Sequence, residues 1–199
     1  TGIVEVPEEE ILRARTAYWA LVTRMDHMIG EILEALGRND LDDDTLVVYT
    51  SDHGEQVGEH GLWWKQTFYE DSVKVPAILS WPGHLPNAER CDRVISSLDL
   101  NATMIDGPSI SAAAAFNGRS LLPLLRGEDG SWDDIAFSEF CLDGSGNGGP
   151  APEEGLYQRM VRGGEWKLNY YHDMPCQLFN LREDPRELDD RANDPAHRG

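Results

Sequence analysis

Residues 49–65, YTSDHGEQVGEHGLWWK, concentrate side chains that bind metal ions and anions. Asp52 and His53 directly follow a short apolar, β-branched run, and Gly54 comes next. A carboxylate and an imidazole at such a turn can both reach one divalent cation, while the glycine lets the backbone approach a ligand closely. Lys65 is a compact cation suited to holding one oxygen of a tetrahedral anion. The alternative is a polar surface loop in which Asp52 caps the turn and the other side chains are solvated.

The elements before this segment predict how it is positioned. Pro7 and three following acids mark a helix start, and apolar residues then recur at three- and four-residue spacing from Ile11 to Leu36. We expect a long helix, closed by Gly37, whose apolar stripe packs in the core. Leu46–Thr50 predicts a strand of the kind buried in a parallel sheet, and ligands of open α/β sheets bind just beyond the carboxyl ends of such strands.

The rest of the chain predicts an α/β layer followed by a small antiparallel sheet. VPAILSWPG indicates a second strand, and RVISSLDL indicates a helix through Ile105 with Asp99 as its N-cap. After about Gly127, IAFSEF, YQRMVRGGEWKLNYY and QLFNL predict strands, with a hairpin turn at Gly163-Gly164. The segment Gly144–Gly155, GSGNGGPAPEEG, is predicted to be a flexible loop.

The composition bounds the partners. The 199 residues carry a formal net charge of −19, from 36 acids against 17 bases. This argues against nucleic acid or an anionic membrane as the main partner, because either requires a basic surface. No apolar run is long enough to span a bilayer. The three cysteines are widely spaced and are expected to be free thiols in a reducing, cytoplasmic compartment. A signal peptide ahead of Thr1 and the oligomeric state are left open.

A longer stretch resembles a known family. TLVVYTSDHGEQVGEHGLWWKQTFYEDSVKVPAILSWPG resembles the second-half signature of type I sulfatases, in the alkaline-phosphatase-like superfamily. YWALVTRMDHMIGEIL, SSLDLNATMID, GRSLLPLLRG and LFNLREDPREL are similar to further family segments, so the resemblance covers nearly the whole chain. The resemblance implies part of an alkaline-phosphatase-like α/β sandwich with a mostly parallel sheet. Residues 1–127 would form the second half of the catalytic domain, and residues 128–199 a truncated antiparallel-sheet subdomain.

The resemblance also implies roles for individual residues. Asp52 and His53 would be ligands of one divalent cation, with calcium preferred and manganese as the alternative. Lys65 would be catalytic, holding an oxygen of a small-molecule sulfate ester. The implied nucleophile is a formylglycine made from the cysteine of a CxPxR motif, which this sequence does not contain. We therefore expect the nucleophile and the remaining metal ligands ahead of Thr1, and we expect the chain alone to be an inactive part of a sulfatase.

Four further residues of the loop are predicted to line the substrate pocket, although packing explains each of them equally well: Glu55, Gln56, His60 and Trp64. Two alternatives to a sulfatase stay open from the sequence. One is a phosphonate monoester or phosphodiester hydrolase of the same superfamily, which would use nearly the same site. The other is a non-catalytic binding module whose site has decayed.

Overall fold

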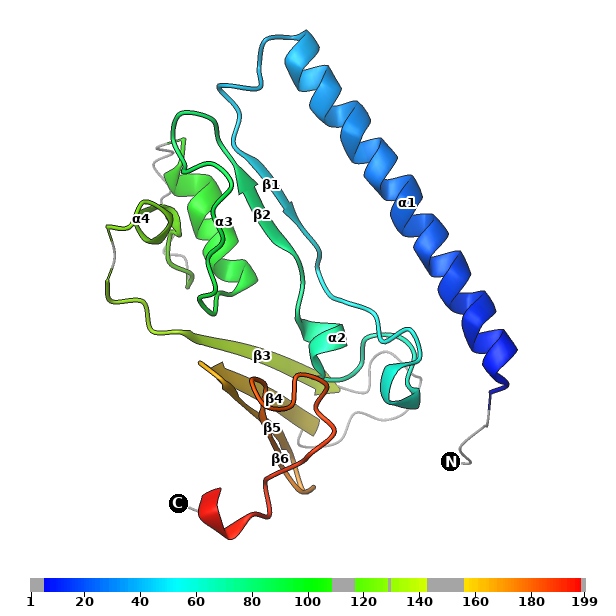
Figure 1. Cartoon of the computed structure of the whole chain (residues 1–199). Coiled ribbons are helices and arrows are strands. Elements are labelled where there is room, and N and C mark those ends of the chain that lie inside the picture. Colours follow the sequence, from blue (N-terminus) through cyan, green and yellow to red (C-terminus); the bar gives the residue numbers. More distant parts are fainter. Residues whose placement is uncertain (1–5, 109–116, 129, 143–155, 198–199) are drawn as a thin grey trace.

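The computed structural model describes residues 6–108, 117–128, 130–142 and 156–197. Figure 1 shows one long helix beside a two-stranded ribbon, two helices on the ribbon's other side, and a separate sheet below. The described helices are α1 (Glu8–Arg38), α2 (Glu70–Val73), α3 (Ser97–Asp106) and α4 (Leu122–Leu125), with 3-10 turns at Glu59–Gly61 and Pro195–His197. The described strands are β1 (Val47–Thr50), β2 (Ala77–Ser80), β3 (Ile135–Leu142), β4 (Leu156–Gly163), β5 (Trp166–Tyr171) and β6 (Gln177–Asn180).

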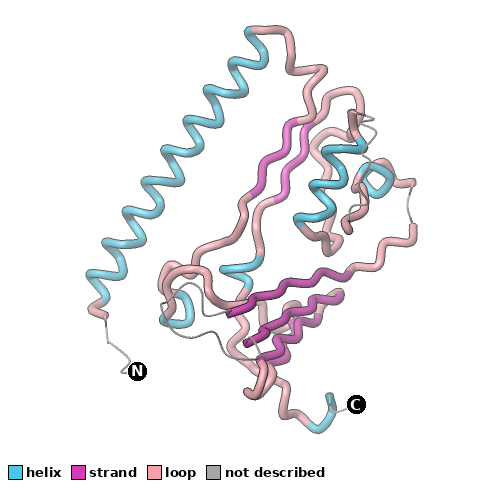
Figure 2. The backbone as a smooth tube through the Cα atoms, turned by 180° about the vertical axis from the view of Figure 1, so that it is seen from behind, coloured by secondary structure: helices cyan, strands magenta, loops and turns pink. Residues whose placement is uncertain are grey.

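Helix α1 forms as predicted, with three acids in its first turn, and it ends at Arg38 rather than at Gly37. The expectation that its apolar stripe is core is wrong for this chain, because none of its residues is buried. Tyr18, Met25 and Ile32 all lie on the surface. Figures 1 and 2 show the reason, since α1 runs alongside the ribbon and no element of the described residues covers its other side. Periodicity identifies an apolar face but does not supply the element that covers it.

The ribbon that precedes the site pairs β1 with β2 in antiparallel register, Val47 opposite Ser80 and Thr50 opposite Ala77. The mostly parallel sheet expected from the sequence is not seen in the described parts of the chain, whose strand pairs are all antiparallel. Strand composition reports burial but not the direction of the neighbouring strand. The position that matters for the site is confirmed, because β1 ends at Thr50 and the polar turn follows at once.

Helix α3 begins with a capping box. Ser96 is the N-cap and its hydroxyl accepts a hydrogen bond from the Leu98 N–H, while the Asp99 carboxylate accepts one from the Ser96 N–H at 2.7 Å. The prediction that Asp99 itself caps the helix is therefore wrong by three positions. Asp99 is the third helical residue, and its second oxygen accepts a hydrogen bond from the Arg119 N–H at 2.9 Å.

The predicted small antiparallel sheet is confirmed, in the strand order β3-β4-β5-β6. The β4–β5 hairpin pairs Gly163 with Trp166, and Gly164 adopts a φ of 55° that favours glycine. The predicted flexible loop Gly144–Gly155 lies in a stretch outside the described residues. The buried apolar side chains of the described residues are Phe68, Leu100, Leu121, Leu122, Met160, Phe179 and Leu181.

Two expectations from the composition can be compared with the structure. Cys91 and Cys176 are free thiols, as predicted, whereas the side chain of Cys141 lies outside the described residues. Among the described helices, none combines the length and the apolar character that a membrane crossing requires.

Candidate active site

The turn after β1 is held by its own polar groups. The Ser51 hydroxyl donates to the His53 carbonyl oxygen at 2.8 Å, and the His53 N–H donates to the Asp52 carboxylate at 3.0 Å. The Gly54 N–H donates to the Ser72 carbonyl oxygen at 2.7 Å, which brings a distant segment against the turn. A Cβ atom at Gly54 would overlap the carbonyl group of Asp71, so the close approach requires glycine.

The three residues singled out in the sequence converge in space. The Nε2 atom of His53 lies 2.7 Å from the Lys65 Nζ and 3.4 Å from the Asp52 Oδ2. Its Nδ1 atom lies 2.7 Å from the Gly54 carbonyl oxygen, which can only accept a hydrogen bond. The geometry therefore assigns the proton to Nδ1 and leaves a lone pair on Nε2. This lone pair faces the lysine and the carboxylate, the arrangement that a metal-binding histidine uses.

The electrostatics of the turn favour an ionised Asp52. Desolvation is the largest single effect and would raise the pKa of this carboxyl group. The charge that His53 carries when it is protonated, the hydrogen bond from the His53 N–H and the charge of Lys65 together outweigh it, so the pKa lies below its usual value. The side chain remains 83% exposed. A negative oxygen is therefore presented to solvent beside the His53 Nε2 atom, whose lone pair faces the Lys65 ammonium at 2.7 Å.

Lys65 reaches the site from a loop that closes on itself. Its carbonyl oxygen accepts a hydrogen bond from the Ser72 hydroxyl at 2.7 Å. Before it, the Glu55 carboxylate accepts a hydrogen bond from the Trp64 N–H at 2.6 Å, and the Gln56 N–H donates to the Trp64 carbonyl oxygen at 3.1 Å. These bonds cross the neck of the loop and fix where Lys65 leaves it.

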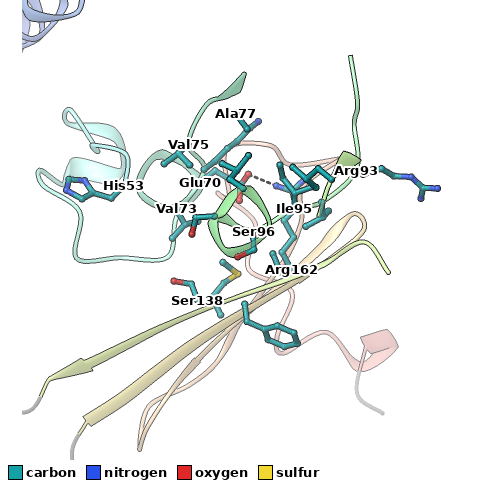
Figure 3. Close-up of a pocket in the computed structure, with 18 of the residues that line it drawn as sticks. His53, Glu70, Val73, Val75, Ala77, Arg93, Ile95, Ser96, Ser138 and Arg162 are labelled. Carbon is teal, nitrogen blue, oxygen red and sulfur yellow. Dashed lines mark hydrogen bonds and ion pairs between the residues drawn. The ribbon is translucent and has the colours of Figure 1, made fainter. Parts of the chain in front are cut away.

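A large open cavity of about 1300 Å³ lies between this loop and the C-terminal sheet. Asp52, His53 and Lys65 line it, and Figure 3 shows His53 at one side of the residues that face it. Ser138 on β3 and Arg162 on β4 line the opposite wall. The candidate site is thus open to a ligand that extends toward the C-terminal sheet.

The structure places the other four predicted pocket residues outside this cavity. The Glu55 carboxylate accepts a hydrogen bond from the Trp64 N–H. Gln56 is buried, with its amide nitrogen 2.5 Å from the Thr67 hydroxyl. His60 stacks on the Tyr69 ring with 3.8 Å between centroids, and Trp64 is mostly exposed. Each of them shapes the loop or its surface in this chain, and their contact with a substrate stays a prediction.

The donor set of Asp52 and His53 fits one divalent cation. Two ligands about 2.4 Å from the same ion and at right angles are about 3.4 Å apart, which equals the separation of the Asp52 Oδ2 and His53 Nε2 atoms. Two protein ligands are too few for a complete coordination sphere. The described residues contain no group of three or more His, Cys, Asp or Glu side chains that could hold a metal.

The fold and this turn define the class of protein. The Sulfatase family profile matches residues 4–107, and the profile described as N-sulphoglucosamine sulphohydrolase, C-terminal, matches residues 58–199. The chain belongs to the sulfatase family, within the alkaline-phosphatase-like fold. It is similar to a choline-sulfatase of Rhizobium meliloti, with 34% identity over 196 residues that cover 96% of this chain and 35% of the relative. Arylsulfatase K of Gallus gallus is 36% identical over 92% of this chain and 34% of its own length.

Solved structures agree with this assignment. The phosphonate monoester hydrolase SpPMH from Silicibacter pomeroyi superposes with a TM-score of 0.85 and 32% identity, covering 98% of this chain and 40% of that one. The phosphonate monoester hydrolase of Agrobacterium radiobacter gives a TM-score of 0.82 and 29% identity, covering 92% of this chain and 38% of that one. The chain therefore spans about a third of the length of the curated relatives it matches.

Sequence reasoning missed Ser72, which is buried and contacts the site from both sides. Its hydroxyl holds the Lys65 carbonyl oxygen and its own carbonyl oxygen holds the Gly54 N–H. No local pattern signals this role, since a serine between an acid and a valine is typical of any short helix. The contact depends on a fold that brings residues 54, 65 and 72 together.

Proposed function

We propose that this chain supplies half of a divalent-metal site and the anion-binding lysine of a sulfuric ester hydrolase. The observation that carries the proposal is the convergence of the Asp52 carboxylate, the His53 Nε2 lone pair and the Lys65 ammonium at the end of β1. Membership of the sulfatase family implies a divalent cation and a formylglycine nucleophile. This sequence contains no CxPxR motif, so the nucleophile must come from residues outside it.

Each residue has a distinct task in this proposal. When bound, the cation neutralises charge on the sulfuryl group and activates the nucleophile. Asp52 and His53 hold that cation, and the Gly54 carbonyl oxygen keeps His53 in the required tautomer. Lys65 donates to a sulfate oxygen and stabilises the charge that builds there in the transition state. In the structure its ammonium group donates to the His53 Nε2 lone pair. Once that lone pair is used for the cation, the ammonium is available to the sulfate oxygen.

Hydrolysis of an aryl sulfate by the full-length protein and its variants tests these roles. Lys65→Ala should lower the rate by about 10²–10³ and leave metal binding intact, as loss of one electrostatic donor does elsewhere. Asp52→Ala should abolish metal binding and activity together. Arg24→Ala is the control, because it removes one positive charge from an exposed position on α1, outside the cavity. Full activity in Lys65→Ala, or full metal affinity in Asp52→Ala, would refute the assignment.

The identity of the cation is a separate proposal. The resemblance favours calcium, but calcium prefers oxygen ligands alone, whereas imidazole suits transition ions. The Asp52–His53 pair therefore favours manganese. Calorimetric titration of the metal-depleted full-length protein with each ion decides between them. Tighter calcium binding would show that ligands outside this chain dominate the choice.

A phosphonate monoester hydrolase is the second candidate function. It is favoured by the similarity to SpPMH, which reaches a TM-score of 0.85. Tetrahedral sulfate and phosphonate esters present the same kind of oxygen to a lysine and a cation, so the described residues suit both. Paired rate measurements on an aryl sulfate and an aryl phosphonate separate the two functions.

A further inference from the structure

A cluster of charged side chains is buried beside the candidate site. Lys167 on β5 is fully buried and forms ion pairs with Glu70, at 3.1 Å, and with Glu187. Arg162 on β4 forms an ion pair with the other oxygen of Glu70 at 2.7 Å. Glu70 and Arg162 line the cavity, as Figure 3 shows, whereas Lys167 and Glu187 are buried and do not line it. Burying charges is costly unless each is paired, so this cluster must be accounted for.

The cluster binds the backbone of the site loop directly. The Lys167 ammonium donates to the Phe68 carbonyl oxygen at 2.7 Å, and the Glu187 carboxylate accepts from the Glu70 N–H at 2.6 Å. Residues 68–70 are thus held at a carbonyl group, at an amide group and through the Glu70 side chain. Both anchoring side chains belong to the C-terminal part of the chain, about a hundred residues away from the loop.

A short path leads from these anchors to the site. The Tyr69 carbonyl oxygen accepts the Ser72 N–H at 2.8 Å, which sets the first turn of α2. Ser72 then holds the Lys65 carbonyl oxygen through its hydroxyl and the Gly54 N–H through its carbonyl oxygen. The position of residues 68–70 therefore determines where Lys65 and the turn after His53 are placed.

We propose that Lys167 and Glu187 are positioning residues, which set the placement of Lys65 from the C-terminal sheet through residues 68–70 and Ser72. The proposal rests on the proposed function of Lys65. It also explains why the charges are buried. Replacing a buried ion pair by apolar residues of similar size is often neutral or stabilising, but apolar residues would not hold a specific carbonyl and a specific amide group.

The experiment uses the paired variant Lys167→Met/Glu187→Leu in the full-length protein. It removes both charges while keeping the side-chain volume, so no unpaired ion is left between them. Arg191→Met/Glu183→Gln, which breaks an ion pair on the surface of the C-terminal segment, is the matched control. Ser72→Ala is a milder second variant that removes only the hydroxyl contact with Lys65. Thermal unfolding confirms that each variant is folded before rates are measured.

A double-mutant cycle with Lys65→Ala separates positioning from general destabilisation. We expect the paired variant to lower kcat about 10- to 100-fold with little change in KM, and to have no further effect in the Lys65→Ala background. A loss of equal size in both backgrounds would overturn the proposal. If Lys65→Ala itself has no effect, the proposed function fails instead.

Amide hydrogen exchange tests the placement without relying on activity. The paired variant should raise the exchange of the Gly54 and Ser72 amides at least about tenfold and leave the β3–β4 amides unchanged. Unchanged protection at Gly54 and Ser72 would overturn the inference even if the rate falls. The surface control should alter neither the rate nor the exchange.

Discussion

Replacing Gly54 by alanine tests the close contact on which the site depends. An added Cβ atom would overlap the Asp71 carbonyl oxygen and lie 2.9 Å from its carbonyl carbon, where ordinary carbon–carbon contacts begin at about 3.5 Å. The contact with the oxygen is the tighter one and lies well inside the distance of about 3.3 Å at which carbon–oxygen contacts begin. The backbone of residues 71 and 72 must therefore move by about 1 Å or more. The movement also opens the 2.7 Å hydrogen bond from the Gly54 N–H to the Ser72 carbonyl oxygen.

The size of the effect follows from these two costs. Overpacking costs about 1–3 kcal/mol and the lost hydrogen bond costs about 1 kcal/mol, so Gly54→Ala should destabilise the fold by about 2–4 kcal/mol. A protein of 199 residues loses about 2–4 °C of Tm for each kcal/mol and a longer one loses less. This predicts a fall of roughly 4–16 °C for the chain and a smaller fall for the full-length protein. Because Ser72 also holds the Lys65 carbonyl oxygen, a displacement of about 1 Å should cost about 10²-fold in rate.

Thermal unfolding and the aryl sulfate rate measure both effects, and Gly30→Ala is the matched control. Gly30 lies inside α1 with nothing within 4 Å of an added Cβ atom, so alanine there should stabilise the chain by about 0.5–1 kcal/mol. A Gly54→Ala variant with the wild-type Tm and rate would refute the reasoning, since residues 54 and 71 could not then be in contact.

Three further substitutions have expected outcomes. The hydrogen bond from Arg186, reinforced by Arg15 against desolvation, holds the pKa of Glu59 below its usual 4.5. The carboxylate therefore stabilises the fold above that pH and loses this effect as the pH falls. The Tm of wild type should exceed that of Glu59→Gln near neutral pH and approach it on acidification, whereas a constant difference would contradict the shift. Burial raises the pKa of Tyr171 from 10.0 to about 12. As the pH rises, the unfolded state loses this proton before the folded state does. The free energy of unfolding of wild type, measured in urea relative to Tyr171→Phe, should therefore fall above pH 10, and a rise would show that the pKa is not raised. Ser96→Ala should cost about 1 kcal/mol in the same assay by removing the cap of α3, and an unchanged midpoint would rule out the capping box.

The sequence predicted the site better than the architecture around it. Asp52 and His53 stand at the end of a β-branched run, and that position alone placed them at the carboxyl end of β1. The convergence with Lys65 is the outcome of a loop closed by Glu55 and Trp64, which spacing could not show. Their roles in binding a metal and an anion stay predictions.

Apart from the cap of α3, which is a local error of three positions, the errors concern partners distant in the chain. The apolar stripe of α1 was expected to be core, but no described element covers it. In β5 the usual alternation is reversed, since Lys167 and Asn169 are buried while Leu168 and Tyr170 are exposed. The sequence hint of a buried charge was a lysine that alternates with apolar residues in a strand. Its burial costs free energy that only the ion pairs with the distant Glu70 and Glu187 offset.

The buried charge cluster also constrains the order in which the chain can acquire its structure. Glu70 meets Lys167 across 97 positions and Glu187 across 117, so both contacts close very long loops. During synthesis from the N-terminus, the Lys65 loop is complete long before the residues that anchor it exist. The turn carrying His53 therefore reaches its final geometry only after β5 and the segment that follows β6 have formed, which makes assembly of the site a late step in folding.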